Sequence, residues 1–177
     1  MVKQMDAEVY NNRGNAKKEL GDYKGAIADY DKAIKLNLKI VESYIDCGNA
    51  KHKLGDFKGA LAEYDKAVEL NPKSAKAYYN RGIAKKKRGD HKGAIADFDK
   101  AIKLNPKFVE AYISRGLAKY YLGDHKGAIA NFDKAIKLNP KLAEAYYKRG
   151  SAKEKLGDHK GADADYNKAI KLYRKKK

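Results

Sequence analysis

The chain has 177 residues, of which 43% are apolar, so it is long enough to bury a core of its own. It contains no run of about 18 apolar residues that would span a bilayer and no signal-peptide pattern at its start, so we expect no membrane segment and no secretion. Cys47 is the single cysteine, which excludes an intrachain disulfide and is typical of a reducing, cytoplasmic setting. The net charge of +17 needs an explanation of its own.

A period of 34 residues runs through the whole sequence. Glycine recurs at this spacing five times: Gly14, Gly48, Gly82, Gly116 and Gly150. A fixed period of this length indicates stacked supersecondary units. It divides the chain without insertions into five repeats, 7–40, 41–74, 75–108, 109–142 and 143–176, within a single predicted domain, 1–177.

Each repeat predicts two helices joined by a tight turn, and the third repeat shows the order of elements. Apolar and small residues recur at helical spacing over 77–85 and again over 94–102. Between them, Gly89 can close the first helix and Asp90 can cap the second. Asn105-Pro106 then ends the second helix, because proline cannot continue its hydrogen-bond ladder.

The sequence therefore predicts an all-α chain of roughly ten helices. One feature of the repeats has no explanation at this level. A glycine stands in the first turn of every second helix, where it costs about 0.5–1 kcal/mol relative to alanine. The five positions are Gly25, Gly59, Gly93, Gly127 and Gly161.

These repeats resemble tetratricopeptide repeats, a family with a 34-residue pattern of aromatic, glycine, alanine and proline positions. In the third repeat the matching residues are Tyr78, Arg81, Gly82, Lys85, Ala94, Phe98, Ala101 and Pro106. The resemblance covers residues 7–176, with some departures: tyrosine replaces the family's tryptophan in all five repeats, and Leu38 and Arg174 stand in place of its proline. It implies a right-handed superhelical solenoid whose first helices line a concave groove for a peptide or a helix of a partner.

Function should then depend on the groove positions at which the repeats differ. By resemblance these positions are polar in the first repeats and become apolar and aromatic in the third and fourth. We expect the partner to contact Asn49, Tyr79, Ile83, Lys86, Ile113, Leu117, Tyr120, Tyr121 and Tyr147. The alternative is that these side chains pack against neighbouring helices or against another copy of the chain. The clamp for acidic chaperone tails is not expected, because Asp46 stands where that clamp needs asparagine.

The positive charge suggests a second, less favoured function, the binding of nucleic acid or another polyanion. Lysine supplies 34 of the 40 basic residues and recurs at fixed positions in each repeat. Two rows result: Lys17, Lys51, Lys85, Lys119 and Lys153, and Lys24, Lys58, Lys92, Lys126 and Lys160. Such rows could follow a phosphate backbone, but they are also typical of solvated helix faces.

No group of residues predicts catalysis, a metal or a cofactor. His91, His125 and His159 take the loop position that Tyr23 and Phe57 take in the other repeats, which indicates packing. Cys47 replaces an arginine and is interpreted as a small filler. Asp29, Asp97 and Asp165 repeat between units and therefore indicate structure rather than an acid/base pair.

The fifth repeat carries Asp163 where the others have isoleucine or leucine, a change that suits a terminal face with no further repeat. The overall prediction is a non-catalytic protein-interaction scaffold, monomeric or weakly self-associating. A duplicated or designed array without a specific partner would fit the near-identical repeats as well.

Overall fold

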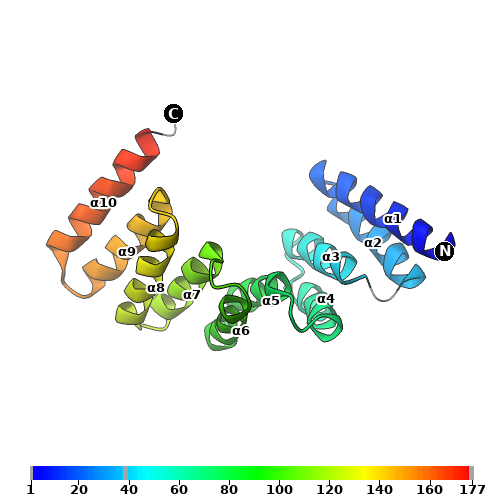
Figure 1. Ribbon diagram of the computed structural model, residues 1–177, viewed down its shortest axis with the longest axis horizontal. Helices are drawn as coiled ribbons and strands as arrows, with labels where there is room; N and C mark the ends of the chain where they lie inside the picture. Colours follow the sequence, from blue (N-terminus) through cyan, green and yellow to red (C-terminus); the bar gives the residue numbers. More distant parts are fainter. Residues whose placement is uncertain (1, 38–39, 176–177) are drawn as a thin grey trace. The chain divides into compact units, whose positions relative to one another are not determined.

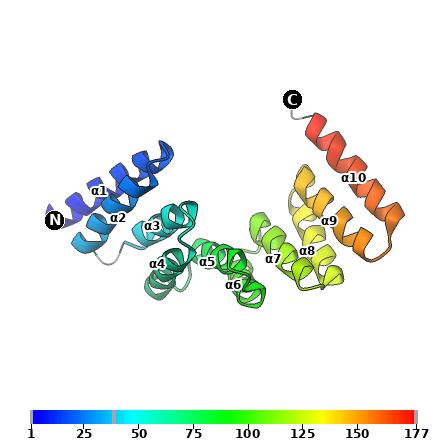
Figure 2. The ribbon, with the colours of Figure 1, turned by 180° about the vertical axis from the view of Figure 1, so that it is seen from behind.

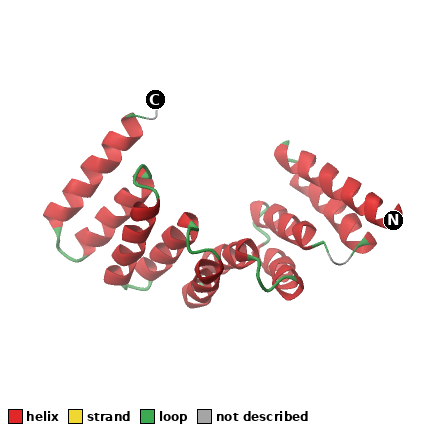
Figure 3. Cartoon of the chain, in the orientation of Figure 1, coloured by secondary structure: helices red, strands yellow, loops and turns green. Residues whose placement is uncertain are grey.

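The computed structural model describes residues 2–37 and 40–175, and within them all regular structure is helical (Figures 1 and 3). Ten helices follow one another along these residues. They are α1 (Val2–Glu19), α2 (Tyr23–Leu36), α3 (Val41–Lys53), α4 (Phe57–Leu70), α5 (Ala75–Lys87), α6 (His91–Leu104), α7 (Val109–Tyr121), α8 (His125–Leu138), α9 (Ala143–Lys155) and α10 (His159–Arg174). The prediction of an all-α chain of helix-turn-helix repeats is confirmed.

The turn inside each repeat has the predicted chemistry. The odd-numbered helices, here called A helices, end at a glycine with φ between 80° and 83°, as at Gly89. The even-numbered B helices then begin after an aspartate cap: Asp90 Oδ1 accepts a hydrogen bond of 2.8 Å from the Gly93 N–H. Only glycine adopts such a φ readily, so this residue type sets the end of the A helix.

The chain divides into two compact units, Met1–Gly89 (unit 1) and Asp90–Lys177 (unit 2). In unit 1 each helix from α1 to α5 packs against the next, and in unit 2 the same holds from α6 to α10 (Figures 1 and 2). The division falls between the two helices of the third repeat, so the prediction of one continuous domain stays a prediction. Leu38, one of the departures from the family pattern, lies outside the described residues.

Close approach of the two helices of a repeat depends on the glycine that recurs at 34-residue spacing. A Cβ atom on Gly48 would lie 2.6 Å from the Tyr64 ring, and one on Gly116 would lie 2.7 Å from the Phe132 ring. Both rings are buried completely or nearly so. In these two repeats the aromatic ring of the B helix therefore fills the space that the missing side chain leaves on the A helix.

Candidate functional site

Unit 1 contains a pocket of about 450 Å³ between the A helices α1, α3 and α5. Its lining combines aromatic and aliphatic side chains with amides and charged groups. The residues are Lys18, Glu19, Tyr23, Asn49, His52, Lys53, Tyr64, Tyr79, Asn80 and Ile83. A pocket of this size, mostly apolar with a few polar groups, suits a side chain together with part of a peptide backbone.

Two asparagines from neighbouring repeats are linked inside this pocket. Asn49 Oδ1 accepts hydrogen bonds from the Tyr64 hydroxyl (2.8 Å) and from Asn80 Nδ2 (3.1 Å). Burial raises the pKa of the Tyr64 hydroxyl, so this group stays protonated and remains a donor. Asn49 Nδ2 and Asn80 Oδ1 have no partner among the described residues, which leaves a donor group and an acceptor for the C=O and N–H of a peptide unit of a ligand.

The charged groups around the pocket are not equally available. Lys18 Nζ donates to Asn15 Oδ1 (3.1 Å) and to Asp46 Oδ1 (2.9 Å), so its charge is already compensated. Lys53 is exposed. Burial, followed by the charges of Lys87 and Lys53, lowers the pKa of His52, so its ring is neutral at pH 7.

His52 is held at this place by packing. Its ring meets the Phe57 ring edge-on, with centroids 5.0 Å apart, and its Nε2 atom is buried without a hydrogen-bond partner. Such an unsatisfied polar atom is unusual in a folded protein.

Unit 2 contains a second, smaller pocket of about 100 Å³, lined by Leu117, Tyr120, Tyr121, Phe132, Tyr147, Lys148 and Ser151. Tyr121 and Tyr147 remain 64% and 51% exposed. Their rings nevertheless contact neighbouring rings. Tyr121 stacks on His91 with ring centroids 5.3 Å apart, and the ring centroids of Tyr147 and Tyr166 are 5.5 Å apart. Exposed aromatic rings with fixed positions are the kind of surface that binds apolar anchors of a partner.

The structure distributes the predicted contact residues over these two pockets. Asn49, Tyr79 and Ile83 line the pocket of unit 1, and Leu117, Tyr120, Tyr121 and Tyr147 line that of unit 2. Ile113 is only 7% exposed and belongs to the core around Phe132, and Lys86 lines neither pocket. The contact role of all nine residues stays a prediction.

Sequence reasoning left Tyr23 and Asn80 out of the contact set. Tyr23 takes a loop position that is filled by Phe or His in the other repeats, which indicated packing alone. In the first repeat, however, this position also forms a wall of the pocket. The histidines of the same position in unit 2 do pack against aromatic rings, since His125 lies 5.0 Å from Tyr120.

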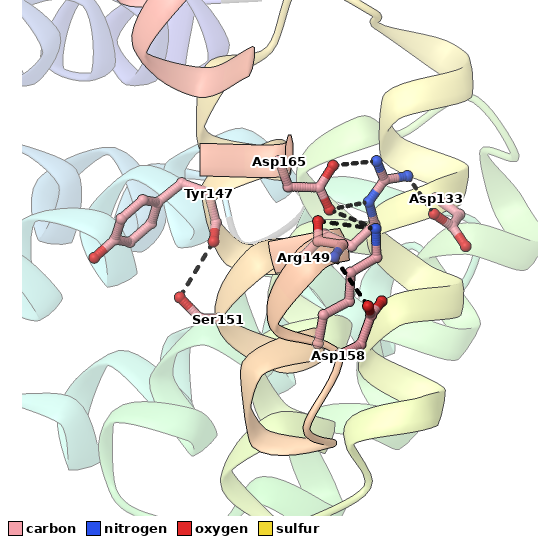
Figure 4. Close-up of polar contacts among 8 residues, drawn as sticks. Asp133, Tyr147, Arg149, Ser151, Asp158 and Asp165 are labelled. Atoms are coloured by element: carbon pink, nitrogen blue, oxygen red, sulfur yellow. Dashed lines mark hydrogen bonds and ion pairs between the residues drawn. The ribbon is translucent and has the colours of Figure 1, made fainter. Parts of the chain in front are cut away.

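Two of the repeated aspartates, Asp29 and Asp165, form ion pairs with the arginine of the A helix in the same repeat, and Figure 4 shows the pair of Asp165. Arg149 donates from Nε and Nη2 to Asp165 on α10 and from Nη1 to Asp133 on α8, at 2.5–2.8 Å. One guanidinium thus joins the B helix of its own repeat to that of the preceding repeat. The carboxylates of Asp133 and Asp165 thus hold helices together.

Cys47 replaces this arginine in the second repeat. The carboxylates of Asp31 and Glu63, which take the places of Asp133 and Asp165, remain there without a guanidinium between them. Lys51 Nζ pairs with Glu63 at 2.5 Å, and the Cys47 thiol donates to Asp31 at 3.8 Å.

The ligand atoms of Asp31, Cys47 and Glu63 lie within 4.8 Å of one another, which is compatible in distance with a metal site. Burial raises the pKa of the Cys47 thiol to about 12, so the thiol stays protonated, and Lys51 already provides a cation. The group is therefore explained as an ion-pair site that has lost its arginine.

Helix hairpins that repeat in register along the chain define a helical repeat protein. The chain belongs to the tetratricopeptide repeat family. Sequence profiles described as "TPR repeat" match residues 48–89 and 116–157, and profiles described as "Tetratricopeptide repeat" match 7–39, 75–108 and 143–176. No protein with a curated description matches the sequence.

Solved structures of similar fold include MamA, which is 32% identical with a TM-score of 0.86 over 92% of this chain and 95% of that chain. MamA from Desulfovibrio magneticus, at 24% identity and a TM-score of 0.88, covers 96% of both chains and shows the fold alone. YrrB, described as a TPR protein with an unusual peptide-binding site, is 25% identical with a TM-score of 0.78 over 94% of this chain and 86% of that chain. No helix among the described residues is both long and apolar enough to cross a bilayer.

Proposed function

We propose that the chain is a non-catalytic scaffold that binds an extended peptide or a helix of a protein partner through its A helices. The observation that carries this proposal is the pocket of about 450 Å³ in unit 1, which is lined by residues that differ between repeats. Residues that serve stacking have to recur, so side chains that change from repeat to repeat are free to serve recognition. The peptide-binding site described for YrrB supports the same proposal.

The chemistry of the partner follows from the lining of the pocket. The donor and acceptor of Asn49 and Asn80 fit a peptide unit, while Tyr79 and Ile83 fit an apolar side chain. Acidic residues beside that anchor would be attracted by Lys53 and by the net charge of +17. The lone, buried Cys47 thiol fits a reducing compartment, and we infer a cytoplasmic location on that ground.

The test is selection of binders from a random peptide library on the full chain, followed by affinity measurement on two pairs of variants. Ile83→Glu and Leu117→Glu place a charge in the pockets of unit 1 and unit 2, while Leu54→Glu and Leu122→Glu place the same charge at exposed positions outside them. At least one pocket variant should lose binding by more than about tenfold, and both controls should keep it. Binding that is unchanged in both pocket variants would contradict the proposal.

Polyanion binding remains the second candidate, because one row of lysines faces solvent. Lys24, Lys58, Lys92, Lys126 and Lys160 are all exposed. The other row is committed in part to ion pairs: Lys17 pairs with Asp29 and Lys153 with Asp165. Leu117→Glu should leave polyanion binding intact, which separates the two functions.

A further inference from the structure

Every joint between consecutive repeats has the same construction. The A helix of one repeat packs on the B helix before it, as α5 packs on α4 and α9 on α8. Two small residues of the A helix, seven positions apart, are fully buried at each joint. The pairs are Ser43 and Ala50, Ala77 and Ala84, Ala111 and Ala118, and Ala145 and Ala152.

The first A helix leaves this face open. In α1 the two positions are Val9 and Ala16; Val9 is 63% exposed and Ala16 is exposed as well. The last B helix leaves the opposite face open. Ile170 of α10 is 48% exposed, whereas the same position in α4, Val68, packs in the cluster that contains Ala77 of α5. Both faces thus expose an apolar side chain to solvent in this chain.

An arginine completes three of these four joints, and in the joint of α3 on α2 its place is taken by Cys47. Arg81, Arg115 and Arg149 each use Nη1 to bind an aspartate of the preceding B helix, and their side chains are only 18–20% exposed. Arg13 of α1 uses Nε and Nη2 for Asp29, as Arg149 does for Asp165. Its side chain is 52% exposed, and its Nη1 has no hydrogen-bond partner among the described residues.

The open face of α10 has acceptors for this arginine. Asn167 takes the place of the aspartate that binds arginine at the internal joints, and Asp163 lies one turn earlier on the same helix, at a position that is apolar in the other repeats. A carboxylate at that position would be costly against a purely apolar helix face. Opposite the free guanidinium nitrogen of Arg13 it would instead be neutralised.

We propose that the face of α1 formed by Val9, Arg13 and Ala16 docks on the face of α10 formed by Asp163, Asn167 and Ile170 of a second copy. The contact repeats the geometry of the joints inside the chain. The contact is heterologous, because it joins the α1 face of one copy to the α10 face of another. Each copy keeps one unused face of the other kind, so association continues beyond two chains unless a ring closes. Repulsion between copies that each carry +17 keeps the association weak.

The first test is sedimentation of the 177-residue chain from micromolar to near-millimolar concentration. The mean mass should rise past that of a dimer. Asp163→Lys should shift the association to higher concentration, and Asn167→Asp, which restores the residue of the other repeats, should strengthen it about fivefold. Glu110→Lys, an exposed change of equal charge on α7, serves as the control for Asp163→Lys.

A mixing experiment decides the geometry. Val9→Asp blocks the α1 face and Ile170→Asp blocks the α10 face, and circular dichroism verifies that each variant folds. Either variant alone should stay monomeric, but their mixture has one intact face of each kind and should form a particle of two chains. A wild-type chain that is monomeric at all concentrations, or single variants that still dimerise by themselves, would overturn the proposal.

Discussion

Cys47 stands where the other A helices carry an arginine. Cys47→Arg should place a guanidinium between Asp31 and Glu63, as Arg149 lies between Asp133 and Asp165. Lys51 can keep its ion pair with Glu63, because Arg149 and Lys153 both pair with the equivalent carboxylate, Asp165. We expect the free energy of unfolding to rise by about 1.5 kcal/mol, the lower end of the usual contribution of hydrogen bonds to charged groups.

Denaturant unfolding measures this change, with Cys47→Ser as the control that alters the thiol without adding charge. The fully buried position could instead be too tight for arginine, which would lower the midpoint. An unfolding midpoint that stays the same or falls for Cys47→Arg would show that the second repeat is packed around the smaller side chain.

The buried aspartates that bind arginine make the stability depend on acid. Hydrogen bonds from Arg13 lower the pKa of Asp29. Burial pulls the pKa of Asp165 upward, but its ion pairs with Arg149 and Lys153 outweigh this effect, and the net shift is downward. The stabilisation is complete above the unfolded value of about 4 and is lost as the pH falls below it.

Asp165→Asn should therefore lower the stability at pH 7 and flatten the loss of stability below about pH 4. Asn131 already occupies the equivalent place in the fourth repeat, where its Oδ1 accepts from Arg115 at 2.7 Å, so the amide is tolerated. Unfolding curves at several pH values provide the measurement, with the exposed Glu110→Gln as the control. If the stability of Asp165→Asn fell equally steeply with acid, the loss of stability would have to come from other carboxylates.

At the scale of the element, the glycine in the first turn of each B helix is explained by the helix cap. A Cβ on Gly127 would lie 2.1 Å from Asp124 Oδ2, and the Gly127 N–H donates to Asp124 Oδ1 at 2.8 Å. The aspartate side chain occupies the space where a side chain of residue 127 would begin. A Cβ at residue 127 would force the Asp124 carboxylate to shift from its present position in the cap.

Gly127→Ala should lower the free energy of unfolding by about 1 kcal/mol, although alanine is the better helix former. Asp124→Ala removes the cap and the obstruction together. In that background the same glycine substitution should become stabilising, so the sign of its effect reverses. Denaturant unfolding of the two single variants and the double variant tests this coupling. Additive effects would mean that cap and glycine act independently.

The helices themselves could be predicted from the sequence, because their signals are local. Gly89 and Asp90 mark the turn of the third repeat, and Asn105 ends α6, as the structure has it. The role of Gly127 could not be predicted, since it depends on where the Asp124 carboxylate lies. The same reason applies to Ile113 and Leu117, which we expected to contact a partner: both pack at the core around Phe132, but Ile113 is buried there, whereas Leu117 is only half-buried and lines the pocket.

At the scale of the whole molecule, two rows of lysines contribute to the charge of +17 and have different tasks. Lys17, Lys51, Lys119 and Lys153 are each paired with a carboxylate, whereas Lys24, Lys58, Lys92, Lys126 and Lys160 are exposed. Of these two rows, only the second has its charges free for a polyanion. We therefore expect attraction to nucleic acid that does not depend on base sequence, because no side chain of this row is suited to reading base edges in a fixed geometry.

Replacing Lys92, Lys126 and Lys160 by glutamine in unit 2 should reduce the slope of log affinity against log salt by at most about 3, since each phosphate contact contributes about 0.9. Fluorescence anisotropy with two DNA duplexes of unrelated sequence measures both the slope and the preference. Lys153→Gln, in the paired row, should lower stability and leave the slope almost unchanged. If one duplex were preferred strongly at physiological salt, nucleic acid would have to replace the peptide as the partner of this chain, because attraction to charge alone cannot distinguish the two sequences.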